Sequence, residues 1–201
     1  MNLNIYPYHR MEYLDKQMQV WSTRLRDDLR IDPLYSNQLA TIIATEVAGL
    51  SDAVKQRIRD NSPISLNTRI EELIGFQSFM DQVAGAVSPS AVIRAQVVYQ
   101  NYICFVYLGE SCFNVLKNEL PPGSTARKCC RFLTDNPIRA FRNAVAHANW
   151  CYLPDYSGLE FWARKGAEAS EPMSRFEVSQ EDLGFWQALA RCTGYAIFIS
   201  L

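Results

Sequence analysis

The sequence has few of the residues from which metal centres and redox sites are made. It contains two histidines and six cysteines among 201 residues. No Cys-x-x-Cys pair occurs, which is the spacing typical of zinc and dithiol sites. The adjacent Cys129 and Cys130 have poor geometry for an internal bridge or a shared metal. His9, at the start of the first predicted helix, is interpreted as a surface or capping residue. We therefore predict no metal, no cofactor and reduced cysteines with a structural role.

Long hydrophobic runs are also missing. The most apolar stretch, Val97 to Leu108, is interrupted by Gln100 and Asn101 and is shorter than the roughly 20 residues that cross a membrane. The first residues, Met1 to Pro7, lack the charged region and apolar block that mark a secretory signal. No glycine-rich phosphate loop follows a predicted strand. We therefore expect a soluble, cytoplasmic protein without membrane association.

Charge of neither sign is in excess, because the formal net charge is −1. That balance excludes a generally basic nucleic-acid coat protein and leaves room for a local basic patch. An apolar content of 48% and a charged content of 20% are typical of a globular protein. No repeat, low-complexity tract or linker divides the chain, so we predict one domain over residues 1–201.

Apolar residues recur at spacings of three and four through the first three quarters of the chain, which predicts a bundle of amphipathic helices. The predicted helices cover about residues 8–30, 36–58, 66–87, 89–120, 124–133 and 138–147. Ser36 is the predicted cap of the second helix. The fourth helix is apolar nearly all round and is therefore expected to be central. Its Gln100 and Asn101 need polar partners, either in a polar cleft or on neighbouring helices.

The character of the sequence changes after Trp150. Residues 159–163 and 174–178 alternate between apolar and polar side chains, as strands do. They predict a small β-hairpin over about residues 158–178, and a C-terminal helix follows over about residues 180–200. The predicted fold class is thus mainly all-α, a multi-helix bundle with a small β-hairpin near the C-terminus.

What the sequence does contain is a group of polar and ionisable residues at the end of the predicted helix 138–147. Arg142, Asn143 and His147 lie within six residues. Asn143 and His147 share a helix face, whereas Arg142 is about 140° from His147 and must reach around the helix. Metal-free RNA cleavage needs a group that moves a proton at a 2′-hydroxyl or a leaving oxygen, and histidine does so near neutral pH. Arginine holds a phosphate through paired hydrogen bonds, and Asn143 is suited to orient the phosphate or the histidine.

The spacing Arg142-Asn143-x-x-x-His147 in a late helix resembles the HEPN superfamily. Residues 141–150, followed by residues 157–162, are similar to a plasmid-borne group within it. The resemblance implies a HEPN-like helical bundle that forms a homodimer, with both motifs in one shared cleft. It also implies a metal-independent endoribonuclease of toxin or phage-defence type, with RNA as substrate and a separate antitoxin or regulatory protein as a candidate partner. Arg142 and His147 would be catalytic, and Asn143 would support them.

Basic residues gather around this motif. The segment from Arg127 to Arg142 contains a single acidic residue, Asp135. The residues predicted to bind RNA are Arg127, Lys128, Arg131 and Arg139. A solvated basic helix face is the alternative interpretation. Four nearby aromatic residues are candidates for base stacking or for the core, namely Phe141, Trp150, Tyr152 and Trp162.

Two further functions are compatible with the motif. A non-catalytic HEPN module would bind RNA, a nucleotide or a protein partner without turnover. In a helical protein of another kind, Arg142 and His147 would only make internal hydrogen bonds. The position of His147 relative to a cleft separates these alternatives.

Overall fold

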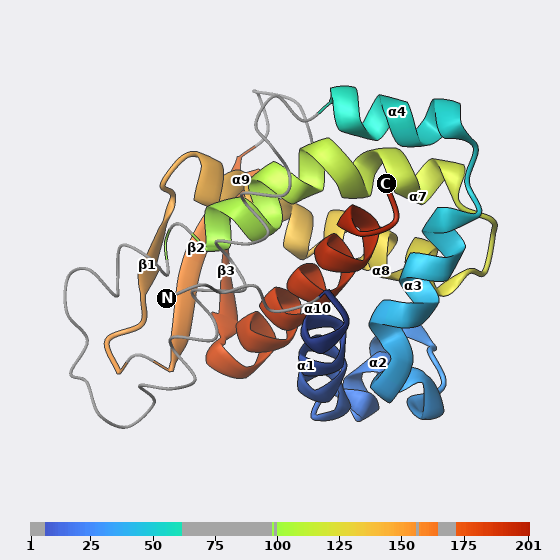
Figure 1. The fold of residues 1–201 in the computed structure, drawn as a ribbon. Helices are drawn as coiled ribbons and strands as arrows, with labels where there is room; N and C mark the ends of the chain where they lie inside the picture. Colours follow the sequence, from blue (N-terminus) through green and yellow to red (C-terminus); the bar gives the residue numbers. More distant parts are fainter. Residues whose placement is uncertain (1–6, 62–97, 99, 156, 165–171) are drawn as a thin grey trace, which may run out of the picture.

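The structure is a computed structural model that describes residues 7–61, 98, 100–155, 157–164 and 172–201. It is mainly helical and carries a small antiparallel sheet near the C-terminus, which confirms the predicted fold class at this level (Figure 1). The helix predicted over residues 66–87 and the start of the one predicted over 89–120 lie outside the described residues. Within the described part, no helix has both the length and the apolar composition needed to span a bilayer.

The elements follow one another along the chain as helices first and strands late. In chain order they are α1 (Pro7–Gln19), α2 (Ser22–Leu29), the 3₁₀ helix η1 (Pro33–Gln38), α3 (Leu39–Ala48), α4 (Asp52–Asp60), the π-helical segments η2 (Tyr102–Tyr107) and η3 (Gly109–Phe113), α7 (Asn114–Glu119), α8 (Thr125–Thr134), α9 (Ile138–Ala146), β1 (Trp150–Tyr152), β2 (Gly158–Arg164), β3 (Met173–Ser179) and α10 (Gln180–Phe198). The predicted C-terminal helix is therefore α10.

The prediction of one helix over residues 8–30 is wrong, because the chain turns between α1 and α2. At this turn the Trp21 N–H donates a hydrogen bond to the Met18 carbonyl oxygen at 3.0 Å. The turn places the Trp21 ring against Phe185 of α10, with 5.6 Å between ring centroids. Aromatic residues are mediocre helix formers, and burying this ring against α10 favours the break.

The prediction that Ser36 caps a helix over residues 36–58 is also wrong. Ser36 is buried inside η1, and its hydroxyl donates to the Pro33 carbonyl oxygen at 2.7 Å. The helix α3 begins only at Leu39, without a side-chain cap from its N-cap residue. It ends before Gly49, a weak helix former, and α4 follows as a separate helix.

Carboxylates from other helices occupy two helix N-termini. Asp15 of α1 accepts a hydrogen bond from the Ala40 N–H at 2.8 Å, in the first turn of α3. Glu46 of α3 accepts from the backbone N–H groups of Thr125 and Ala126 at 3.0 and 2.6 Å, in the first turn of α8. The first turn of a helix carries N–H groups without intrahelical partners and the positive end of the helix dipole. These bonds therefore join α1, α3 and α8 in addition to their apolar packing.

The segment from η2 to α7 is central, as predicted. Its buried side chains include Ile103, Phe105, Leu108, Phe113 and Leu116. Asn101 is fully buried, and its Oδ1 accepts a hydrogen bond from the Gln187 amide of α10 at 2.6 Å. Of the two alternatives for this residue, the structure supports a partner on a neighbouring helix.

The sheet has three antiparallel strands in the order β1-β2-β3. The strands β2 and β3 form the predicted hairpin, whereas β1 has three residues, too few for a recognisable alternation. Phe161 of β2 pairs with Trp150 of β1 and Phe176 of β3. Figure 1 shows the sheet at one end of the helical part. From the end of β3, α10 runs back among the other helices.

Phe141 of α9 connects the helices to the sheet. Its ring is fully buried and lies 5.4 Å from Phe105, 5.2 Å from Phe161 and 5.8 Å from Trp186, centroid to centroid. These rings come from η2, β2 and α10. The tilted and edge-on geometries are those that aromatic rings prefer. The orientation of α9 is therefore fixed by this fully buried aromatic side chain.

All six cysteines are free, as predicted. Cys151 is exposed, and the other five are buried. Burial raises the pKa of the Cys104, Cys112 and Cys129 thiols to about 12, because a thiolate loses its hydration in an apolar interior. These thiols act as small apolar side chains at neutral pH.

Replacing Asp15 with Asn should maintain or increase stability at pH 7. Burial raises the pKa of the Asp15 carboxyl, against the lowering effect of the Ala40 N–H bond. The folded state thus holds this proton more tightly than the unfolded state, so the contribution of Asp15 to stability is largest at low pH and is lost as the pH rises through the raised pKa. An asparagine oxygen still accepts from Ala40, whereas Asp15→Ala should cost about 1–2 kcal/mol. Denaturant titrations at pH 4 and pH 7 measure both variants.

The asparagine variant should also lose part of the pH dependence of wild-type stability. If Asp15→Asn is destabilised at pH 7 as strongly as Asp15→Ala, then the charge at the N-terminus of α3 outweighs the burial of the carboxylate.

Candidate functional site

The motif residues lie outside the buried face of α9, which Phe141 occupies. Ile138, Phe141 and Val145 are buried, whereas Arg142 is half-buried and His147 is exposed. This division follows from the amphipathic pattern of the helix. The polar residues therefore border solvent while the opposite side holds the helix in the core.

The chain leaves α9 through a closed turn that positions His147. The Asn149 N–H donates to the Ala144 carbonyl oxygen at 2.8 Å, and the Ala148 N–H donates to Val145 at 3.3 Å. These two bonds form a Schellman motif, with Ala148 in the left-handed conformation (φ 56°). The Asn149 carbonyl oxygen then accepts from the Trp162 N–H at 3.0 Å. The residue after the motif is thus bonded to α9 and to β2.

The Arg142 side chain has partners on α9 and on η3. Its Nε and Nη2 donate to the Oδ1 of Asn143 at 3.2 and 2.8 Å, and its Nη1 forms an ion pair with Glu110 of η3. The stem lies beside Gly109, where an added Cβ would be 3.7 Å from the Arg142 Cδ. A guanidinium has five N–H groups, so two remain for a ligand.

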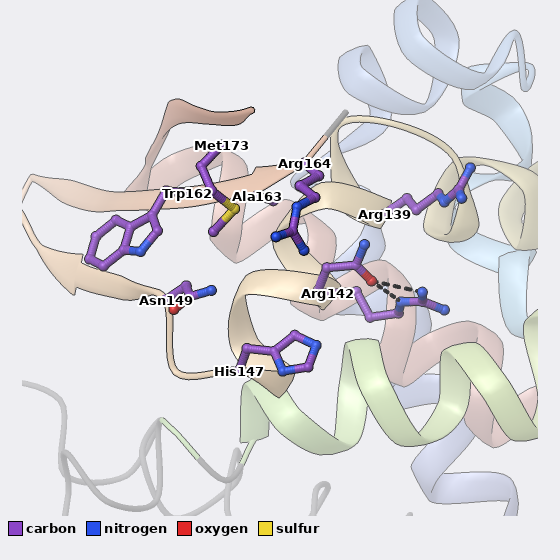
Figure 2. A pocket seen from close by; sticks show the side chains of 9 residues that line it. Arg139, Arg142, His147, Asn149, Trp162, Ala163, Arg164 and Met173 are labelled. Atoms are coloured by element: carbon purple, nitrogen blue, oxygen red, sulfur yellow. Dashed lines mark hydrogen bonds between the residues drawn. The ribbon is translucent and has the colours of Figure 1, made fainter. Parts of the chain in front are cut away.

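The motif borders an open pocket of ≈ 290 Å³ between the end of α9 and the sheet. From α9 and the turn after it, the lining residues are Arg139, Arg142, Asn143, His147 and Asn149; from the sheet they are Trp162, Ala163, Arg164 and Met173. Figure 2 shows the guanidinium of Arg164 directed from the sheet toward α9. Arg142, bonded to Asn143, lies on the helix side of the pocket. Helix and sheet thus each contribute one wall.

The structure brings together Arg142, Asn143, His147 and Arg139, and it separates them from the other three predicted RNA-binding residues. Those three belong to α8, do not line the pocket and have partners elsewhere: Arg127 donates to the Leu120 carbonyl oxygen at 3.0 Å, Lys128 donates to the Arg30 carbonyl oxygen at 2.8 Å, and Arg131 lies 3.8 Å from the Asp135 carboxylate. The basic segment is therefore not one continuous surface around the motif.

The aromatic candidates are also divided. Phe141 belongs to the core, and the half-buried rings of Trp150 and Tyr152 pack on each other with centroids 5.6 Å apart. Trp162 lines the pocket. Of the four residues considered for base stacking, Trp162 is the one that borders the motif.

Sequence reasoning missed Arg164, Met173, Asn149 and Glu110. Trp162 and Arg164 are two residues apart in a strand and so share a face, which was a usable signal. Glu110 and Met173 carry no local signal, because each reaches the site only through tertiary packing.

The pocket is suited to an anion. The described residues that line it supply three guanidinium groups and an imidazole, and none of them is a carboxylate. Guanidinium groups bind phosphate oxygens in pairs of hydrogen bonds. In the described part of the chain, no three His, Cys, Asp or Glu side chains are grouped as metal ligands would be.

Comparisons with known proteins add no name to this geometry. No protein-family model, curated protein or solved structure matches the chain. The likeness to the HEPN superfamily therefore stays a hypothesis based on the motif residues.

Replacing Ala148 with Gly should stabilise the protein by about 0.5–1 kcal/mol, because glycine adopts the left-handed conformation without the steric cost of a Cβ. The free energy of unfolding in denaturant measures the change. The matched control is Ala146→Gly in the last turn of α9, which should lower stability by up to about 1 kcal/mol. Equal losses in both variants would contradict the closed turn.

Proposed function

We propose that this chain is a metal-independent endoribonuclease of the HEPN type, acting as a homodimer in a toxin or phage-defence role. The observation that carries the proposal is the shared pocket of Arg142, Asn143 and His147, with the arginine bonded to the asparagine and still holding two N–H groups. This arrangement offers a phosphate clamp and a proton-transfer group side by side.

In the proposed reaction the 2′-oxygen of a ribose attacks the adjacent phosphorus while the bond to the 5′-oxygen breaks. His147 takes the proton of the 2′-hydroxyl or gives one to the leaving 5′-oxygen. Arg142 stabilises the extra negative charge on the phosphate oxygens. Asn143 holds the guanidinium in place. The products are a 2′,3′-cyclic phosphate and a 5′-hydroxyl.

The reaction requires one proton acceptor and one proton donor, and among the described residues one imidazole lines the pocket. His147 is exposed, so a second copy of the chain can bring its own His147 to the same phosphate. This need for a second proton-transfer group supports a homodimer with facing pockets.

A non-catalytic module that binds RNA, a nucleotide or a protein partner is the second candidate. Two observations favour it: Glu110 pairs with Arg142, and the His147 imidazole has no hydrogen-bond partner among the described residues to orient it. In this alternative the pocket binds an anionic group and no bond is broken.

Arg142→Ala and His147→Ala should each lower RNA cleavage about 100-fold or more, because each removes a group that acts in the transition state. Cleavage of a mixed transcript pool in EDTA is the measurement. Arg59→Ala is the control, since Arg59 is exposed on α4 and does not line the pocket. Equal activity in wild type and both site variants would refute the proposal.

Tight RNA binding without cleavage by the wild type would favour the second candidate. Light scattering gives the oligomeric state of the same samples. Growth arrest on expression, relieved by a separately encoded protein, would support the toxin role with an antitoxin partner.

A further inference from the structure

The wall of the pocket that faces α9 comes from the sheet, and its residues have no part in the proposed proton transfer. Trp162 and Arg164 share one face of β2 because they are two residues apart. Met173 pairs with Arg164 across the sheet and lines the same pocket. In Figure 2 the indole of Trp162 lies at the end of the pocket away from Arg142.

Trp162 differs from the other three tryptophans of the chain. Trp21, Trp150 and Trp186 each pack on another aromatic ring, with centroid distances of 5.6, 5.6 and 5.8 Å, and all three belong to the hydrophobic core or pack against it. Among the described residues, Trp162 has no ring partner and lies outside this core. Its half-buried ring therefore borders the pocket without being part of an aromatic cluster of the described residues.

Positive charge lies next to this ring. The guanidinium groups of Arg139, Arg142 and Arg164 all line the pocket. An aromatic ring beside arginines is the combination with which proteins bind unpaired nucleotides, because bases stack on the ring and phosphates pair with the guanidinium groups.

The volume of the pocket limits the size of the group that can bind in it. Its volume of ≈ 290 Å³ is at the lower end of the about 300–1,000 Å³ typical of small-ligand sites. This is room for about one nucleotide with its phosphate.

We propose that Trp162, Met173 and Arg164 form a binding subsite for one nucleotide of single-stranded RNA, an inference that rests on the proposed function of the adjacent motif. The base next to the phosphate held by Arg142 stacks on the indole, with the Met173 thioether beside it. Arg164 binds the following phosphate. A paired base cannot present its face to the ring, so the subsite selects unpaired RNA.

Binding of a fluorescent single-stranded RNA of twelve nucleotides, measured by anisotropy in EDTA, tests the subsite. All variants are made in the His147→Ala background, so that the probe stays intact. Trp162→Leu should weaken binding about 10-fold, and Trp162→Phe should retain most of it, because phenylalanine still offers a ring for stacking. The corresponding RNA duplex should bind weakly and show no dependence on Trp162.

The charge of Arg164 is tested against a control at an arginine outside the sheet. Arg164→Gln should weaken binding and lower the slope of log Kd against log salt by about 1. Arg26→Gln removes the same charge from α2, where the exposed Arg26 pairs with Asp27 and does not line the pocket; it should leave binding unchanged. Circular dichroism and thermal unfolding identify any variant that fails to fold.

The outcomes separate this inference from the proposed function. If the wild type binds single strands through Trp162 but cleaves nothing, the subsite stands and the nuclease proposal fails. If the wild type cleaves RNA while Trp162→Leu and Arg164→Gln bind as the background does, the subsite is refuted and the nuclease proposal stands. If Trp162→Leu weakens the binding of single-stranded RNA and of the duplex equally, the subsite is also refuted.

Discussion

The packing of Phe141 is the interaction on which the site depends. Its fully buried ring meets Phe105, Phe161 and Trp186, so three separate elements fix the position and rotation of α9. Truncating a phenylalanine of this kind typically costs about 3–5 kcal/mol. Successive helix residues are rotated by about 100°, so a buried Phe141 directs Arg142 to the side of the helix. The chemistry of the motif is thus oriented by the apolar residue beside it.

The sheet adds a second constraint at the same place. The left-handed Ala148 ends α9 in a closed turn, and the Asn149 carbonyl oxygen continues directly into the hydrogen bonds of β2 through Trp162. A helix end and a strand therefore meet through backbone bonds. The backbone of His147, held between two such elements, is placed more firmly than on a free loop, and the cost is one alanine in a conformation that favours glycine.

Sequence reasoning succeeded where structure is local and failed where it is tertiary. Hydrophobic period predicted the helices and the hairpin, and helix spacing placed His147 beside its polar neighbours. The break at Trp21 depends on a ring in α10, and the start of α3 is capped by Asp15 of another helix. In the site, Glu110 and Arg164 come from segments far from the motif in the sequence. They lie next to the motif only because of the way α9 packs. No window of neighbouring residues contains that information.

The partners of Arg142 determine how an anion can bind. The side chain of Asn143 accepts two hydrogen bonds from the guanidinium and so fixes its position. The Glu110 carboxylate cancels part of its charge, but it is exposed, and an exposed ion pair contributes only about 0–1 kcal/mol. A phosphate bound to the two remaining N–H groups can therefore share the guanidinium with Glu110 or displace it. Net attraction for the anion then depends on the other cations of the pocket, Arg139 and Arg164, which makes the sheet wall part of the electrostatics of the motif.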